Sequence, residues 1–229
     1  MKTPLRLLPV LALVVCLATL ARGSAVSYSG PEASRTNAPA QGGKPAEGLC
    51  TRSGCHIDNA ASVNTSGSLQ ILDLPDWYVP GRTYRLRVRL ASTHTTSAVG
   101  RRWGFQMTAV RGSDGTGAGT FTVRGNQISG PGGDTLWIQN GLGNFASRQY
   151  VEHLFEGTHY GQASPAEWSF DWTAPASGSG TIRFYAAGNA GDGSDDPTGD
   201  WIYTTADSMQ DTTTAVVTRT WGSLKQQWR

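Results

Sequence analysis

The stretch from Thr83 to Leu90 reads TYRLRVRL, and it places an apolar side chain at every second position, with arginines between them. Side chains of a β-strand point alternately to its two faces, so this pattern predicts a strand with one face in a core and the other in water. Pro80-Gly81, directly before the stretch, is typical of a turn. We therefore expect an all-β protein built around this strand.

Further short segments of strand-like composition lie between turn-rich stretches of glycine, serine and aspartate. Glycine makes up 29 of the 229 residues, and strands do not alternate with helices. Such a series predicts two antiparallel sheets packed face to face rather than a parallel α/β fold. The expected strands are 68–74, 102–110, 119–124, 135–139, 148–154, 167–172, 180–187 and 202–205.

The first residues have the layout of an export signal. Lys2 and Arg6 supply a positive start, residues 7–20 form an apolar run, and Gly23-Ser24-Ala25 is a small-residue cleavage site. The apolar run is shorter than the roughly 18 to 20 residues that span a bilayer. We therefore expect residues 1–25 to be a signal peptide. The mature chain is then periplasmic, on the cell surface or secreted, with no transmembrane segment.

The mature chain is close to electrically neutral. The sequence has 19 Lys and Arg against 17 Asp and Glu, and loss of Lys2, Arg6 and Arg22 with the signal leaves 16 basic residues and a net charge of −1. The basic residues are scattered among acidic ones, without the basic stripe that binds nucleic acid. We expect no nucleic-acid partner.

Residues 26–67, which precede the strands, are called the leader here. Residues 26–48 of the leader are rich in Ser, Gly, Pro, Asn and Ala and have almost no apolar periodicity. This composition predicts an extended and poorly packed segment. The sandwich is expected to follow over residues 68–205.

Residues 206–229 form the expected C-terminal tail. Trp221, Leu224 and Trp228 within it have the spacing of one helix face. This spacing predicts a short C-terminal helix, whose two indoles would cap the sandwich; a sorting or partner-docking tag is the alternative role.

The leader carries the only cysteines that remain after signal removal, in the sequence Cys50-Thr-Arg-Ser-Gly-Cys55-His56. Two thiols can form thioethers with the vinyl groups of a porphyrin, and the adjacent imidazole can bind the iron. Four residues separate the cysteines instead of the usual two, a spacing similar to that of multihaem cytochromes of the c3 type. The motif predicts one covalent haem c, with Cys50, Cys55 and His56 as cofactor-binding residues and His56 as a metal ligand.

A local disulfide is the alternative for the same two cysteines. Exported proteins with two cysteines usually pair them in an oxidising compartment. A disulfide between Cys50 and Cys55 would make the chain a non-catalytic adhesion or matrix module on the cell surface. The sequence leaves both possibilities open.

A second axial ligand for the iron would be a histidine or a methionine elsewhere in the chain. His153 is the first choice, because it lies in the strand-like stretch Tyr150-Val151-Glu152-His153, which could hold it rigidly. A solvated or hydrogen-bonded side chain remains the alternative for each candidate. The other candidates are His94, His159, Met107 and Met209.

An acidic loop from Gly188 to Asp200 is a weaker candidate for a metal site. Its carboxylates stand among glycines, and oxygen-rich loops of this kind can hold calcium. The spacing does not match an EF-hand, and Asp-Gly and Asp-Pro pairs are common in ordinary turns. The four carboxylates of this loop are Asp192, Asp195, Asp196 and Asp200.

No motif of a catalytic nucleophile, a zinc protease or a phosphate-binding loop occurs, so we name no catalytic residue. We expect an electron carrier or binding module, and an enzyme that uses an open iron position for peroxide chemistry is the remaining alternative.

Several short motifs lie along the chain from about Tyr28 to Thr205. They are YSGP at 28–31, the cysteine and histidine motif at 50–56, WYVPGRTY at 77–84, WGFQ at 103–106, YVEH at 150–153, WSFDWTAP at 168–175, FYAAGNA at 184–190 and GDWIYT at 199–204. Together these motifs resemble the Reeler-like exported domains of bacteria called choice-of-anchor V.

The resemblance implies an immunoglobulin-like β-sandwich, a haem motif and a recurring histidine at the position of His153. The chain departs from this pattern in the four residues between its cysteines. Extracytoplasmic redox proteins or surface proteins are the expected partners, and the oligomeric state is left open.

Overall fold

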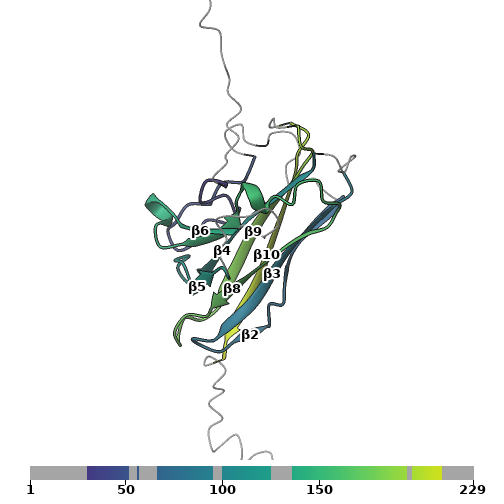
Figure 1. The fold of residues 1–229 in the computed structure, drawn as a ribbon. Helices are drawn as coiled ribbons and strands as arrows, with labels where there is room; N and C mark the ends of the chain where they lie inside the picture. The colour runs from purple at the N-terminus through teal and green to yellow at the C-terminus, as the bar shows by residue number, and fades with distance from the viewer. Residues whose placement is uncertain are drawn as a thin grey trace, which may run out of the picture.

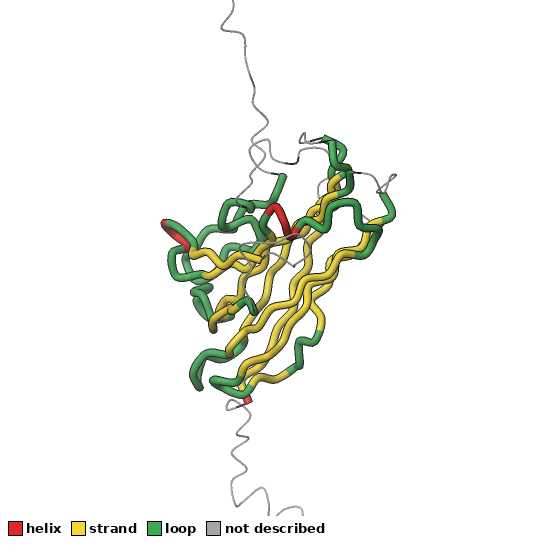
Figure 2. The backbone as a smooth tube through the Cα atoms, viewed as in Figure 1, coloured by secondary structure: helices red, strands yellow, loops and turns green. Residues whose placement is uncertain are grey.

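The structure is a computed structural model that describes residues 30–51, 56, 66–94, 100–124, 136–194 and 198–212. These residues form two β-sheets packed face to face, and the long strands of both sheets run in nearly the same direction (Figures 1 and 2). The four-stranded sheet has the order β1 (Gly67–Leu72), β3 (Thr83–Ser92), β8 (Ala166–Thr173) and β5 (Thr120–Thr122). The six-stranded sheet has the order β2 (Trp77–Tyr78), β10 (Trp201–Asp211), β9 (Ile182–Gly191), β4 (Arg102–Arg111), β7 (Gln149–His153) and β6 (Leu136–Asn140).

Every pairing between neighbouring strands is antiparallel except that of β10 with the short β2. The described residues contain no α-helix, and their short 3-10 turns include Gly143–Phe145 and Phe155–Gly157. None of the helices there is long and apolar enough to cross a membrane. The predicted all-β sandwich of two sheets is therefore confirmed.

The core between the sheets is unusually aromatic. Trp168, Phe170 and Trp172 of β8 are buried and meet Phe105 of β4 and Phe184 of β9. Offset and edge-to-face ring pairs of this kind add to the free energy gained from burying their area. The aromatic rings of β8 thus hold the four-stranded sheet against the six-stranded sheet.

The alternation in TYRLRVRL has the predicted structural cause. Leu86, Val88 and Leu90 are fully buried in the core, while the arginines between them lie on the outer face of the four-stranded sheet. There Arg87 pairs with Asp73 at 2.6 Å and Arg89 with Glu167 at 3.1 Å. Such exposed pairs contribute little to stability, so β3 is held in the sandwich mainly by the burial of its apolar face.

Strand β4 differs from β3 because both of its faces are covered. All residues from Trp103 to Val110 are buried. Trp103, Phe105 and Met107 face the core, so Gly104, Gln106 and Thr108 face outward. The outward face of β4 is covered by residues 30–51 of the leader, which lie along the six-stranded sheet and are coloured purple in Figure 1.

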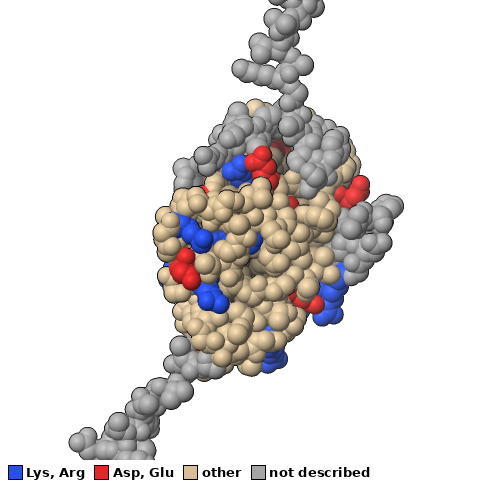
Figure 3. Space-filling model, turned by 90° about the vertical axis from the view of Figure 1, so that its left-hand side faces the viewer, with Lys and Arg blue, Asp and Glu red and all other residues tan. Residues whose placement is uncertain are grey.

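The expected strands are all present, with small shifts at their ends. The short β2 was not predicted, and β10 continues to Asp211, past the expected end of the sandwich at residue 205. The predicted signal peptide and the predicted C-terminal helix lie outside the described residues. On the face drawn in Figure 3, basic and acidic side chains are interspersed on a largely uncharged surface.

Candidate functional site

Residues 30–51 of the leader pack on the outer face of the six-stranded sheet, so the expectation of poor packing is wrong for residues 30–48. The amide of Gln106 donates to the carbonyl oxygen of Glu32 at 2.9 Å and accepts the backbone N–H of Arg35 at 2.7 Å. Gln139 of β6 donates to the carbonyl oxygen of Pro31 at 2.9 Å. The side chains of Gln106 and Gln139 therefore form hydrogen bonds with the leader backbone, which a neighbouring strand would form in a sheet.

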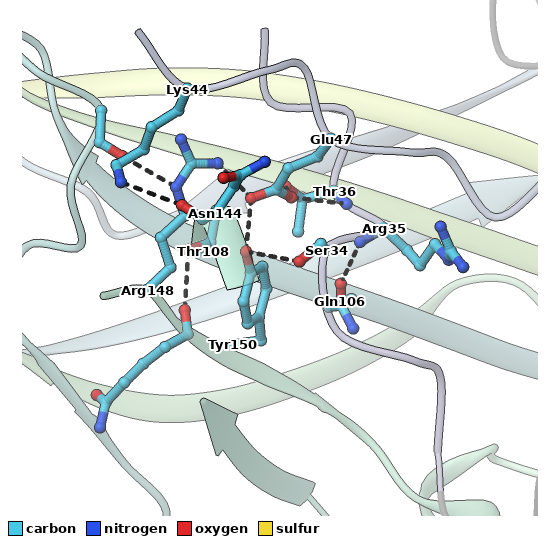
Figure 4. A network of polar contacts seen from close by, with 12 residues as sticks. Ser34, Arg35, Thr36, Lys44, Glu47, Gln106, Thr108, Asn144, Arg148 and Tyr150 are labelled. Carbon is cyan, nitrogen blue, oxygen red and sulfur yellow. Dashed lines mark hydrogen bonds and ion pairs between the residues drawn. The ribbon is translucent and has the colours of Figure 1, made fainter. Parts of the chain in front are cut away.

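A buried ion pair between Glu47 of the leader and Arg148, next to β7, fastens the middle of the leader (Figure 4). Both side chains are 0% exposed. The carboxylate of Glu47 also accepts the hydroxyl of Tyr150 at 2.6 Å and that of Thr36 at 2.5 Å. Burial and the adjacent Glu47 charge raise the pKa of Tyr150 well above its usual range. We call Glu47 with these three partners the clasp.

Glu152 on β7 is a second buried carboxyl under the leader. Gln106 and Gln139 each donate an amide hydrogen bond to it at 2.6 Å. Burial raises the pKa of Glu152 to about 7, although both hydrogen bonds act in the opposite direction. Near neutral pH this carboxyl therefore changes between its protonated and its charged form.

His153, the predicted second ligand, ends β7 with its imidazole set against the backbone of β4. Its Nδ1 lies 2.9 Å from the amide nitrogen and 3.0 Å from the carbonyl oxygen of Phe105. A Cβ on Gly104 would lie 2.5 Å from Cε1 of the ring, so only glycine leaves room for it. Burial lowers the pKa of His153 to about 4, and the imidazole is neutral at physiological pH.

His56 of the cysteine and histidine motif contacts Asp200 and Asn189. Its Nδ1 is in direct contact with Oδ2 of Asp200, which is only 5% exposed. The Nδ2 of Asn189 lies 3.3 Å from Nδ1 and 3.4 Å from Nε2 of His56. The imidazole is thus held over the six-stranded sheet, with its Nδ1 turned to a carboxylate.

The imidazoles of His56 and His153 lie on the same outer face of the six-stranded sheet, and we call this surface the histidine face. Gly104 of β4 and Asn189 of β9 are cross-strand partners, so both positions face the same side. The ring of His153 lies over Gly104, and the ring of His56 contacts the side chain of Asn189. The nearby His56 is a further cause, after burial, of the lowered pKa of His153.

Cys50 is brought to this face by the same leader. Its Sγ lies 3.9 Å from the carbonyl oxygen of Arg35, and the amide of Arg35 is bonded to Gln106 of β4. Thr36 and Leu49 form a bridge that places Cys50 at the end of the docked hairpin. Cys55 lies outside the described residues. Of the other three predicted site residues, His56 and His153 lie on one face of the six-stranded sheet, and Cys50 belongs to the leader segment that packs on that sheet.

The other candidate ligands lie elsewhere. Met107 and Met209 are fully buried in the core, on the opposite side of the six-stranded sheet from His56. His94 stacks on Trp201, with ring centroids 3.5 Å apart. His159 packs near Trp168, 5.1 Å between centroids, and its charge lowers the pKa of His153.

The acidic loop predicted as a calcium site contributes one carboxylate to the histidine face. Asp200 accepts the backbone N–H of Asp192 at 3.1 Å and contacts His56 through its other oxygen. Asp192 accepts the N–H of Ser194 at 2.9 Å, which is ordinary turn bonding. Asp195 and Asp196 lie outside the described residues. Among the described residues, no group of three or more metal-binding side chains is found, and calcium stays a prediction.

Comparisons with known proteins find no matching family model and no matching curated protein. The structure is similar to the reeler domain of human F-spondin, with 20% identity, 68% of this chain and 92% of that chain covered, and a TM-score of 0.38. The Reelin-N domain of F-spondin has 19% identity, covers 71% of this chain and 94% of its own length, and also has a TM-score of 0.38. A cohesin module from a Clostridium perfringens family 33 glycoside hydrolase has 10% identity, coverages of 65% and 98%, and a TM-score of 0.38.

Proposed function

We propose that this chain is an exported c-type haem protein that carries single electrons. In this proposal Cys50 and Cys55 would hold one haem c through thioethers, and His56 and His153 would bind its iron. Each thiol would add its S–H across one vinyl C=C bond of the porphyrin, so no atom would be lost. The bound group supplies a one-electron couple between ferric and ferrous iron.

The observation that carries the proposal is the placement of His56 and His153 at neighbouring positions on one sheet face. Each ring is held at Nδ1, His56 by Asp200 and His153 by the backbone of Phe105. Histidines that bind metals commonly donate Nδ1–H to a carboxylate or a backbone carbonyl, which fixes the tautomer and leaves Nε2 for the metal. Nδ1 of His56 contacts such a carboxylate, whereas Nδ1 of His153 lies close to both the N–H and the carbonyl oxygen of Phe105. The donor set of two thiols and two imidazoles fits a c-type haem.

The neutrality of His153 supports a ligand role. An imidazole binds iron only in its unprotonated form, and burial holds the pKa of His153 at about 4. The leader docked over β4 and β7 would keep water away from this side of the sheet. Glu47 and its clasp partners hold Cys50 near the sheet, and Asp200 orients His56.

The proposal includes export and a Reeler-like, immunoglobulin-like form of the sandwich. The resemblance of the motifs, the signal-like residues 1–25 and the haem motif all agree with a location outside the cytoplasm, where haem attachment takes place. The partners would then be extracytoplasmic redox proteins or surface proteins that exchange one electron with the iron.

The test is to produce the full chain in a host that contains a c-type haem maturation system and an export route. We expect a purified protein with visible haem absorbance and an intact mass equal to the processed chain plus one haem. A matched chain with Cys50→Ser and Cys55→Ser should be exported but colourless. A colourless wild-type chain that is lighter by two hydrogens would overturn the proposal and favour the disulfide-bonded adhesion module.

A further inference from the structure

Asp200 is a nearly buried carboxylate at the edge of the histidine face, directly before β10. Its Oδ2 contacts Nδ1 of His56, and its Oδ1 accepts the backbone N–H of Asp192 at 3.1 Å. The Nδ2 of Asn189 lies 3.4 Å from Oδ2. The carboxylate therefore has a fixed orientation toward the imidazole.

Asn189 presents its amide nitrogen to this carboxylate rather than its oxygen. The Oδ1 of Asn189 is buried and has no hydrogen-bond partner among the described residues. A buried amide oxygen without a partner costs free energy, so the orientation is retained because Nδ2 gains contacts with Asp200 and His56. In the reverse orientation the amide oxygen would lie against the negative carboxylate.

We propose that Asp200 is a positioning residue that controls the tautomer and the electron density of His56, with Asn189 holding Asp200 in place. This inference rests on the proposed function, because its main consequence concerns iron bound to His56. The carboxylate accepts Nδ1–H of His56 and makes the imidazole a stronger electron donor through Nε2.

The consequence is a lower reduction potential than the same two axial imidazoles would give alone. A buried negative charge bonded to the ligand stabilises the form with the greater positive charge, which is the ferric state. The chain would therefore suit a carrier at the low-potential end of an extracytoplasmic reaction sequence, accepting one electron from a strong reductant.

The first test is a redox titration of haem-loaded Asp200→Asn against the wild-type chain. Asparagine keeps the size of the side chain and removes its charge, so we expect a higher midpoint potential with an unchanged low-spin optical spectrum. Asp171→Asn is the matched control, because Asp171 of β8 pairs with Arg85 and Arg124 on the other sheet. Its potential should equal that of the wild type. Equal potentials for all three chains would overturn the inference while leaving the haem proposal standing.

The second test needs no cofactor and keeps the inference separate from haem attachment. In the full chain with Cys50→Ser and Cys55→Ser, nitrogen chemical shifts report the tautomer of His56. We expect the proton on Nδ1 when Asp200 is present, and a shift toward the Nε2–H tautomer in Asp200→Asn. A proton on Nε2 with Asp200 in place would overturn the inference, whereas a wild-type chain without haem would overturn the proposed function.

Discussion

Gly104 of β4 and Asn189 of β9 are direct partners across the two strands, and each supports one of the two imidazoles. The ring of His153 occupies the space where a side chain at 104 would begin. The ring of His56 lies against the amide of Asn189. The cross-strand pairing of positions 104 and 189 thus places the two imidazoles next to each other on the sheet.

Gly104→Ala is expected to displace the imidazole of His153. The new methyl group would lie 2.5 Å from Cε1 and 2.7 Å from Nε2 of that ring, closer than atoms can approach. We expect a loss of about 1–3 kcal/mol in the free energy of unfolding, as for other overpacked sites. In the haem-loaded chain the optical spectrum should also change from low spin toward high spin.

The double variant Gly104→Ala, His153→Ala is the control for this clash. Without the imidazole the added methyl group has room, so Gly104→Ala should cost little further stability in the His153→Ala background. Equal costs of Gly104→Ala in both backgrounds would show that His153 does not occupy that space.

Because the clasp joins the leader to the sandwich, we expect its loss both to destabilise the protein and to release the leader. Glu47→Gln leaves the charge of Arg148 buried without its partner, so we expect a loss of about 3–5 kcal/mol in the free energy of unfolding. The same substitution should expose the leader to proteases near residues 36–49. Chemical denaturation and limited proteolysis measure the two effects.

An exposed ion pair in the same leader is the matched control for the clasp. Glu32 and Arg35 also pair, but the Glu32 side chain is 75% exposed. Glu32→Gln should therefore change the free energy of unfolding by less than about 1 kcal/mol. Comparable losses for Glu32→Gln and Glu47→Gln would contradict a buried clasp.

The raised pKa of Glu152 should make the free energy of unfolding depend on pH. Its pKa rises from 4.5 in the unfolded chain to about 7 in the folded chain, so the folded chain binds this proton more tightly. The contribution is complete below pH 4.5 and is lost as the pH rises through about 7. The free energy of unfolding of the wild type, minus that of Glu152→Gln, should fall across this range. A flat or rising difference would exclude the raised pKa.

The lowered pKa of His153 should make its contribution to the free energy of unfolding depend on pH in the opposite direction. Its pKa falls from 6.5 to about 4 on folding, so its contribution is complete above pH 6.5 and is lost as the pH falls through about 4. In the cofactor-free chain with Cys50→Ser and Cys55→Ser, the ring resonances of His153 should show a neutral imidazole down to about pH 4. Titration near pH 6.5 would mean that the ring is in water.

The strands were predictable because their signals are local. The alternation in β3 and the turns around each strand depend on neighbouring residues in the sequence. These patterns located the long strands other than β10 to within a few residues. Strand β2 was missed because it has two residues and pairs only with the end of β10. Strand β10 was predicted too short, because Asp207 and Ser208 within it do not resemble a buried strand.

The docking of the leader was not predictable from composition. Its residues lack apolar periodicity because the leader packs through polar groups, with Glu47, Gln106 and Arg148 in buried contacts. Such contacts join residues 71 to 101 positions apart and leave no local pattern. One feature of the sequence did indicate that another segment covers β4. Gln106 and Thr108 interrupt an otherwise apolar strand, and their side chains on its outer face need polar partners.

The histidine face was predicted in part. His56 and His153 were chosen from the motif and from the strand-like stretch before His153, and both lie on this face. Asp200 was assigned to a calcium loop because it follows other aspartates, and its contact with His56 depends on the folded chain. Gly104 and Asn189 gave no chemical signal, since their role is to leave space and to orient a neighbour.

The most direct measurement of the central claim is a pyridine haemochrome spectrum of the purified, denatured wild-type chain. The position of its main visible band reports how many vinyl groups of the haem have been saturated by thioethers. We predict the band of a haem with both vinyl groups saturated, and retention of the colour with the chain after acid and organic extraction. A band typical of free vinyl groups, or colour that is extracted from the chain, would contradict covalent attachment through Cys50 and Cys55.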